Sequence, residues 1–510
     1  MPESKPPSRG LRFALAHVTL ELTTPMTIGT GGGDDLRDST CVLDANGLPT
    51  IPATSLAGML RAAWAARKTR DEVEALFGFQ RGVHGAPSRV ELSWAAVHGA
   101  KDLPVPPRVA PEALIGDPVL AFLEAGVVRD HVRLDHKGVV DRAGKFDELL
   151  VPAGARFTFE LLVHAPDEEK TLIDLLALLH RGGLRLGGRT RRGFGSFKVA
   201  RCASGSFDLR RAQDRAAFAR VPRDLAAPGS GLTETRPEQL PAPEAPRDRV
   251  RVELSLRPQD HWLFGTGTAV RPEHRTREQG REGKAHDKVP VTERRIRWSG
   301  GQGSVVSVEN AEVLVPASGI KGALRHRTLF HARRRAGQWA LDTVTTDHLD
   351  DFRQWAEAPD RERPDPLGGE HSGDVEQAVA ALFGSIKRAR DADDAEDAGL
   401  PGRVFLTDLY LDPAEARSGA LQHVSLDRFT QAPMDGLLYS EAPISRSPKL
   451  MVTLDIDREG VPPLALQALA DALEDLAAGR LALGAGANRG HGYFTDPDAN
   501  VSGLHRRGDA

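Results

Sequence analysis

Alternating and periodic hydrophobic positions divide the 510-residue chain into two halves with the same order of elements. Apolar and polar residues alternate over Phe13–Leu22 and again over Val250–Leu256, which predicts a β-strand at the start of each half. Helical periodicity follows over Glu168–His180 in the first half and over Leu464–Ala478 in the second. A glycine-rich turn and a closing strand over Gly195–Ala200 complete the first half.

Short blocks of sequence also recur in the same order in the two halves. Each half ends with a glycine-rich turn that carries arginine between apolar residues, at 184–197 and at 481–494. The further matching blocks are Ile28–Gly31 with Phe264–Gly267, Ile51–Arg61 with Val315–Arg325, Ala75–Gly78 with Ala381–Gly384, and His131–Asp135 with His423–Asp427. Ordered repetition at this separation predicts two whole domains in tandem.

The domain boundary is predicted where apolar periodicity stops. Residues 222–249 are rich in proline and small residues, as in a semi-rigid linker. The chain therefore divides into a first domain at 1–221, a linker at 222–249 and a second domain at 250–510. Within the second domain, the polar and basic stretch Arg271–Arg297 is predicted to be a mobile loop, and 346–378 is a charged insertion.

The order of elements in each half is β-α-β-(insert)-β-α-β, which predicts an α+β fold of the ferredoxin-like type shared with RNA-recognition modules. The first helix of each half follows a proline at a strand end. Thr54 or Ser55 in the first half, and Ser318 in the second, are predicted to cap these helices, because their hydroxyls can accept hydrogen bonds from free backbone N–H groups.

Composition narrows the class of protein. Hydrophobic residues make up 40% of the chain, no run approaches 18 apolar residues, and Met1–Gly10 has no apolar signal segment. The two cysteines, Cys41 and Cys202, are too few for a disulfide framework or a zinc site. We therefore expect a protein of the reducing cytoplasm with no membrane association.

The net charge of −4 gives no general attraction to nucleic acid, but the basic residues are clustered. Arg185, Arg189, Arg191, Arg192 and Lys198 lie together in the first glycine-rich turn, without an acidic residue among them. Local potential rather than net charge decides whether a phosphate binds. Glycine backbone beside guanidinium groups is a surface that phosphates can approach closely.

Together these blocks resemble the RAMP superfamily of CRISPR-Cas systems, in particular the backbone subunits of type III effector complexes. The resemblance rests on Ile51–Gly58 with Arg61, on Val315–Gly322 with Arg325, and on the glycine-rich loops Leu186–Phe197 and Leu483–Phe494. It covers nearly the whole chain, twice. Most such subunits are single domains, so this chain is similar to the variants in which two are fused.

The resemblance implies a subunit that binds a CRISPR guide RNA, assembles with other effector subunits and cleaves complementary target RNA. The segments 131–150 and 423–441 are similar to the thumb-like hairpins that wedge between bases. His131, Asp135, His423 and Asp427 fit a satisfied hairpin network better than a catalytic site. The residues implied in RNA binding are Ser55, Arg61, Arg189, Arg191, Arg192, Ser318, Lys321, Arg325 and Arg489.

In the family, an aspartate in the loop between the first strand and the Pro-Ser helix supports cleavage. The corresponding loop here contains Asp34, Asp35 and Asp38, and the Asp38-Ser39 run makes Asp38 the first candidate. The second half lacks such a run, and Asp287 beside His286 is its candidate, so cleavage is expected at one or both domains. Such a carboxylate would hold Mg²⁺, or another divalent cation, or assist a ribose 2′-OH as it attacks the adjacent phosphate.

Three alternatives stay open. A guide-processing endonuclease of the same superfamily would use a histidine, for which His17, His131 and His423 are available. A plain RNA-binding module would stack bases on aromatic side chains, and Arg192–Phe197 is near that signature, although Ser196 breaks it. A non-catalytic assembly subunit would carry neither activity.

Overall fold

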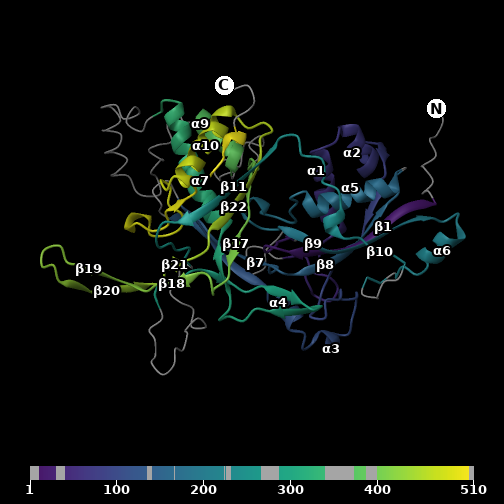
Figure 1. Ribbon diagram of the computed structural model, residues 1–510, viewed down its shortest axis with the longest axis horizontal. Coiled ribbons are helices and arrows are strands. Elements are labelled where there is room, and N and C mark those ends of the chain that lie inside the picture. Colours follow the sequence, from purple (N-terminus) through teal and green to yellow (C-terminus); the bar gives the residue numbers. More distant parts are fainter. Residues whose placement is uncertain are drawn as a thin grey trace. The chain divides into compact units, whose positions relative to one another are not determined.

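The chain forms two compact units. The computed structural model describes residues 11–29, 41–134, 140–165, 167–222, 224–225, 231–265, 286–338, 373–385 and 399–504. Unit 1 comprises Met1–Arg247 together with Thr292–Glu312, and unit 2 comprises Asp248–Val291 together with Val313–Ala510. Their helices and strands are labelled in Figure 1.

Unit 1 is built on an antiparallel sheet. Strand β1 (Arg12–Leu22) pairs with β8 (Arg156–Val163) on one side and with β9 (Phe197–Asp208) on the other, and β4 (Val90–Leu92) pairs with β8. The order β9-β1-β8-β4 is the ferredoxin-like order, with β10 (Thr233–Glu234) added beside β9. Helices α1 (Ala53–Ala65) and α5 (Glu168–Arg181) make the two crossovers.

Unit 2 repeats this order. Strand β11 (Arg249–Pro258) pairs with β22 (Leu450–Asp457) and β23 (Phe494–Thr495), and β16 (Val404–Leu406) pairs with β22. The crossover helices are α7 (Ala317–Arg335) and α10 (Pro463–Ala477). The predicted fold class, the opening strands and the second helix of each half are confirmed.

The remaining elements connect these frames or project from them. In unit 1 they are α2 (Arg70–Phe77), β2 (Phe79–Arg81), β3 (His84–Ala86), β5 (Ala96–Val97), α3 (Pro111–Leu114), α4 (Pro118–Ala125), β6 (Val127–Leu134), β7 (Val140–Leu150), the 3-10 helix η1 (Thr190–Arg192), α6 (Ala212–Phe218), η2 (Pro237–Gln239), β12 (Thr292–Glu293), β13 (Ile296–Ser299) and β14 (Gln302–Val305). In unit 2 they are β15 (Glu312–Val315), α9 (Gly373–Phe383), β17 (Leu409–Leu411), β18 (Arg417–Ser418), β19 (Leu421–Leu426), β20 (Pro433–Glu441), β21 (Ile444–Arg446), η5 (Ala487–Arg489) and η6 (Ser502–Leu504). No helix within the described part of the chain combines the length and apolar character needed to cross a membrane.

The alternation along β1 sets up the core of unit 1. Ala14, Ala16, Val18, Leu20 and Leu22 belong to the main buried cluster, which includes residues of α1 and α5. The intervening Phe13 and Leu15 are buried against Phe207 in a second, smaller cluster on the other face of the sheet. Residues of one strand therefore stabilise both sides of the sheet.

The first helix of each unit begins one position after its proline. Pro52 and Pro316 are the cap residues of α1 and α7, and neither helix has a side-chain cap from its own first turn. The prediction that Thr54, Ser55 or Ser318 caps a helix was therefore wrong, because these residues already lie inside the first turn. In unit 2 the carboxylate of Asp408 accepts a hydrogen bond from the first N–H of α7, that of Ala317, at 2.8 Å.

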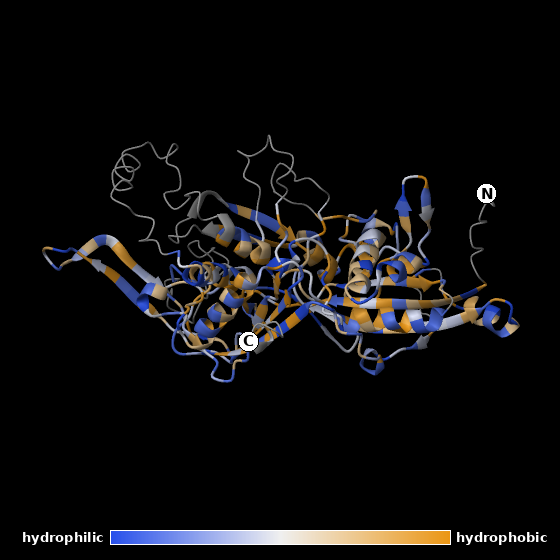
Figure 2. Cartoon of the chain, turned by 90° about the horizontal axis from the view of Figure 1, so that it is seen from above, coloured by the Kyte–Doolittle hydropathy of each residue, from blue (hydrophilic) through white to orange (hydrophobic). Residues whose placement is uncertain are grey.

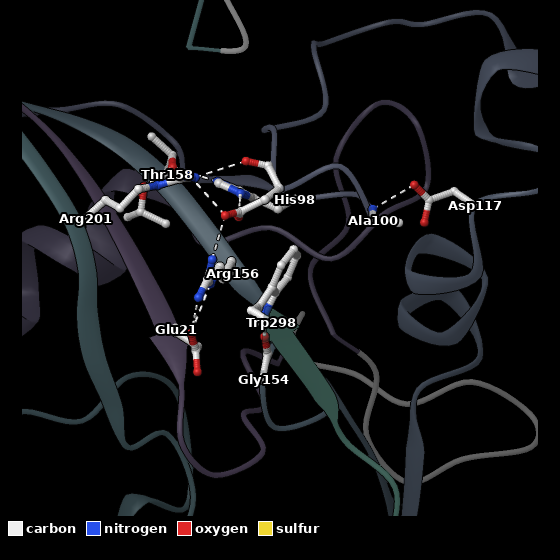
Figure 3. A network of polar contacts seen from close by, with 11 residues as sticks. Glu21, His98, Ala100, Asp117, Gly154, Arg156, Thr158, Arg201 and Trp298 are labelled. Carbon is white, nitrogen blue, oxygen red and sulfur yellow. Dashed lines mark hydrogen bonds and ion pairs between the residues drawn. The ribbon is translucent and has the colours of Figure 1, made fainter. Parts of the chain in front are cut away.

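The segment Thr292–Glu312 lies in the predicted second domain but packs as part of unit 1. The indole N–H of Trp298 donates to the carbonyl of Gly154 at 2.7 Å, and the Arg156 guanidinium lies 4.4 Å from the Trp298 ring centroid (Figure 3). The backbone N–H of Ile296 donates to Ala153 at 3.0 Å. Arg129 donates to both carboxylate oxygens of the buried Glu293, at 2.6 and 3.0 Å.

Two predictions about loops change accordingly. The part of Arg271–Arg297 within the described residues, 286–297, contains β12 and the start of β13, so it is not the irregular loop that its polar composition predicted. The proline-rich 222–249 also contacts unit 1, since Leu240 is buried and the carbonyl of Glu244 accepts from Arg67 at 2.6 Å.

The glycines of the two repeated turns are required by contacts within the chain. Gly195 has φ +75°, and a Cβ at this position would lie 1.9 Å from the carbonyl oxygen of Leu186. Gly492 has φ +81°, and a Cβ there would lie 2.1 Å from the carbonyl oxygen of Leu483. These glycines allow two segments of backbone to meet, and the sequence interpretation of the glycines as an approach route for phosphates did not include this constraint.

We predict that Gly492→Ala destabilises unit 2 far more than Gly490→Ala. Both glycines have φ near +80°, so each alanine costs about 1–2 kcal/mol of backbone strain. Only the alanine at 492 also overlaps a backbone oxygen, which adds about 1–3 kcal/mol. Thermal or urea unfolding of the two variants measures the difference, and equal losses would contradict this account.

We also predict that Trp298→Ala destabilises unit 1 by about 2–4 kcal/mol, because the half-buried indole loses its packing and its hydrogen bond. Trp94→Ala is the matched control, since Trp94 is 55% exposed and its loss should cost about 0.5 kcal/mol or less. Hydrogen exchange of residues 149–154 should accelerate only in the Trp298 variant. Unchanged exchange there would show that Thr292–Glu312 is not needed to hold this part of unit 1.

Candidate functional site

In unit 1 a buried carboxylate joins the base of a β-hairpin to the glycine-rich turn. Glu148, on β7, has a fully buried side chain and forms ion pairs with Arg189 of the turn and with His131 of β6, the latter at 3.3 Å. The His131 ring stacks on Phe146 with centroids 5.1 Å apart. The Arg189 guanidinium also lies 5.2 Å from the Phe146 ring centroid. A buried carboxylate is stable when it is paired in this way.

Unit 2 repeats the cluster. Glu441, at the end of β20, is fully buried and pairs with Arg489 at 2.6 Å, with Lys288 at 3.0 Å and with His423 at 3.3 Å. The His423 ring stacks on Tyr439 with centroids 4.9 Å apart. Burial raises the pKa of the Glu441 carboxyl, but the hydrogen bond from Lys288 and the charge of Arg489 outweigh it and hold that pKa below its ordinary value.

The two clusters recruit their arginine from different positions of the turn. In unit 2 Arg489 is the last residue of η5, whereas in unit 1 Arg189 immediately precedes η1. Arg189 has a left-handed backbone, φ +51°, where unit 2 has Gly486. Such a conformation costs about 1–3 kcal/mol for a non-glycine residue. Arg192, the counterpart of Arg489, lies 5.5 Å from the Phe146 ring centroid, and burial lowers its pKa.

Asp287 lies on the surface beside the unit 2 cluster. Its Oδ2 accepts hydrogen bonds from the backbone N–H of Ser440, at 2.7 Å, and from the Ser440 hydroxyl, at 3.3 Å. The neighbouring Lys288 bridges to Glu441, the residue after Ser440. The segment that carries the predicted catalytic aspartate is therefore attached to the base of the hairpin.

Asp38 lies outside the described residues, but the segment that follows it matches the one that follows Asp287. In unit 1 the N–H of Val42 donates to Ile28 at 2.9 Å, and in unit 2 the N–H of Val291 donates to Phe264 at 2.8 Å. The next bridges, Gly29 with Cys41 and Gly265 with Pro290, also correspond. Asp38 stands three residues before Cys41 in the sequence, and Asp287 stands three residues before Pro290.

A family model described as the RAMP superfamily matches residues 19–198 and 299–495, which is more than half of the chain and one region in each half. The chain belongs to the RAMP superfamily.

Among solved structures, the chain is similar to a chain of the cryo-EM structure of the Type III-B Cmr-beta bound to cognate target RNA. The two are 20% identical with a TM-score of 0.28, and the match covers 38% of this chain and 62% of that chain, which is less than two thirds of its length. No match to the curated proteins was found.

The predicted RNA-binding residues on the first helices of the RAMP domains differ in accessibility. Arg61 on α1 and Arg325 on α7 are exposed, whereas Ser55 and Ser318 are half-buried. Lys321 is also half-buried, and its ammonium donates to the carbonyl of Val404 at 3.4 Å. The structure therefore leaves Arg61 and Arg325 in the better position to contact a ligand from solvent.

The predicted residues of the turns divide in the same way. Arg189 and Arg489 hold the buried glutamates, and about a third of each side chain is exposed. Arg191, in η1, is half-buried. Phe194 is fully buried, so it cannot stack on a base, which removes the aromatic side chain that the RNA-recognition-motif alternative most needed.

The predicted hairpins are present in both RAMP domains, as β6–β7 and β19–β20. His131 and His423 pair with the glutamates, and the Asp427 carboxylate accepts from the N–H groups of Phe429 and Thr430, so these residues form the expected hairpin network. Asp135 lies outside the described residues. Figure 2 shows hydrophobic and hydrophilic residues alternating along the β19–β20 hairpin, and Phe429 at its turn is 92% exposed.

A divalent cation at Asp287 would need ligands from a substrate. Among the described residues there is no group of three or more His, Cys, Asp or Glu side chains that could hold a metal ion. Magnesium is often held by one or two carboxylates together with substrate phosphates and water. The exposed Asp287 carboxylate fits that mode of binding, and does not fit a metal site built from protein ligands alone.

Glu148, Glu441 and Lys288 were not predicted as site residues. One signal was available for the glutamates, because each follows an aromatic residue by two positions, in Phe146-Asp-Glu148 and in Tyr439-Ser-Glu441. Each pair also follows a histidine of the repeated blocks, at 131 and 423. Nothing in the sequence shows that these glutamates are buried.

Proposed function

We propose that this RAMP protein is a guide-RNA-binding backbone subunit of a type III CRISPR-Cas effector complex, and that it cleaves complementary target RNA at two positions. The observation that carries the proposal is the repetition, in both domains, of a hairpin joined to an arginine-bearing turn by a buried glutamate. In unit 2 an aspartate segment is attached to this assembly. Its partners would be the guide RNA, the target RNA and the other subunits of the complex.

Binding of the guide rests on local charge. The chain has a net charge of −4, so affinity for a polyanion must come from clustered cations. Arg61 and Arg325 are exposed at matching positions of the first helices, and each turn adds a partly exposed arginine. Contacts of this kind position the RNA backbone without reading its sequence.

Cleavage requires little from the protein. The Asp287 carboxylate would accept the proton of a ribose 2′-OH while O2′ bonds to the adjacent phosphorus. The bond from phosphorus to O5′ then breaks, O5′ takes up a proton, and the products are a 2′,3′-cyclic phosphate and a 5′-hydroxyl. A divalent cation such as Mg²⁺, held by Asp287 and phosphate oxygens, would stabilise the charge that develops on the phosphate. Asp38 would act in the same way in the first domain.

A guide-processing endonuclease that uses a histidine is the weaker candidate. His131 and His423 form ion pairs with the buried glutamates and stack on aromatic rings, and His17 pairs with Glu160 at 3.2 Å. The exposed carboxylate of Asp287 is more accessible to a ribose hydroxyl than these rings. A non-catalytic subunit remains the outcome expected if neither aspartate matters.

We predict that the Arg61→Ala, Arg325→Ala double variant binds guide RNA less tightly and with a weaker salt dependence. Each lost phosphate contact should reduce the slope of log K against log salt by about 0.7 for single-stranded RNA. Arg210→Ala is the control, because Arg210 is exposed but pairs with Asp208. Guide-RNA binding measured at salt concentrations from about 50 to about 300 mM tests this prediction. Identical slopes for all proteins would contradict the assignment.

We predict that Asp287→Asn removes one of two cuts in a complementary target, that Asp38→Asn removes the other, and that the double variant removes both. Loss of the proton acceptor should slow each cut by about 10²–10⁴-fold. Asp498→Asn, at an exposed position, is the control. The cut positions are mapped on target RNA treated with the complex assembled with guide RNA. Full cutting by the double variant would mean that neither aspartate is catalytic.

A further inference from the structure

Glu441 joins three separate segments of unit 2. It is itself the last residue of the hairpin strand β20, it pairs with Arg489 of the glycine-rich turn, and it pairs with Lys288 of the aspartate segment. Backbone hydrogen bonds fix the last of these segments on both sides of Glu441. The Lys288 N–H donates to Ser440 at 3.1 Å, and the Ala442 N–H donates to the Lys288 carbonyl at 2.8 Å.

The charges around Glu441 are unbalanced. A single carboxylate, with no exposed surface, faces the ammonium of Lys288 and the guanidinium of Arg489, which are 49% and 30% exposed. Both cations extend inward from the surface toward one buried anion. Removing that anion leaves two cations with no shared counter-charge and removes the ion pairs that link the segments that carry them.

Asp287 depends on the same arrangement. Its carboxylate is bound to the N–H of Ser440, one residue before Glu441, and its own chain neighbour is Lys288. Any displacement of Lys288 from Glu441 therefore moves Asp287 relative to the hairpin that would present the target. A displacement of about 1 Å can slow a reaction by about 10²-fold.

We propose that Glu441 is a positioning residue, whose buried charge holds the Asp287 segment, the hairpin and the arginine-bearing turn in the arrangement needed for cleavage. Glu148 holds the hairpin and turn of the first domain in the same way. The effect on cleavage rests on the proposed function, whereas the attachment of the Asp287 segment does not.

The attachment is tested first, by hydrogen exchange of the full chain. Glu441→Gln keeps the shape of the side chain and removes its charge, so the amides of residues 286–289 and of Ala442 should exchange at least about tenfold faster. Glu441→Asp keeps the charge and should recover part of the protection. Glu459→Gln, an exposed glutamate of the same unit, should change nothing. Unchanged exchange at 286–289 in Glu441→Gln would overturn the proposal.

Cleavage is tested next in the assembled complex, where the other domain of the same chain is an internal reference. Glu441→Gln should slow the cut that Asp287→Asn removes by about 10- to 100-fold and leave the other cut unchanged. General unfolding would slow both cuts together, and that result would also overturn the proposal.

A Lys288→Met variant tests the route of the effect. If Glu441 acts through Lys288, the double variant Glu441→Gln, Lys288→Met should lose no more activity at that cut than the more impaired single variant. Multiplied losses would assign Glu441 another role and overturn the proposal. If the wild-type complex cuts no target at all, the proposed function fails, and the exchange measurement still decides whether Glu441 holds the Asp287 segment.

Discussion

The ion pair between a fully buried glutamate and an arginine of the glycine-rich turn is the interaction around which each domain of this RAMP protein is organised. Glu148 and Glu441 stand at the bases of hairpins, and their arginine partners come from the glycine-rich turn later in each domain. An unpaired carboxylate at such a depth would be strongly destabilising, so the hairpin and the turn must come together. The arrangement of hairpin and turn within each domain follows from that electrostatic requirement as much as from the sheets.

The duplication preserved this interaction while its sequence changed. Arg189 supplies the guanidinium in unit 1 from a left-handed position, whereas Arg489 supplies it in unit 2 from three positions further along the turn. Phe146 and Tyr439 fill the same place beside a histidine. The arginine side chain is long enough to reach one carboxylate from either position, so the same ion pair forms from different places in the turn.

One segment of the second half of the sequence folds as part of unit 1. Thr292–Glu312 follows the Asp287 segment in the chain but is packed into unit 1 through Trp298 and the buried Arg129–Glu293 pair. The start of this segment falls in Arg271–Arg297, which was predicted to be a mobile loop because it is polar and has little periodicity. The partners lie more than 140 residues away, in Gly154 and Arg129, where local sequence patterns carry no information.

The sequence by itself determined the repeat, the order of strands and helices, and the RAMP resemblance, because alternation and helical periodicity record which face of each element is buried. It also indicated the arginine-bearing turns, whereas a catalytic role of Asp287 stays a prediction. It did not indicate that Pro52 and Pro316, rather than hydroxyl residues, cap the first helices, or that the turn glycines serve contacts between backbone segments. Only the tertiary structure decided that Glu148 and Glu441 are buried and which arginine meets each, because burial and charge pairing between distant segments depend on how the whole domain packs.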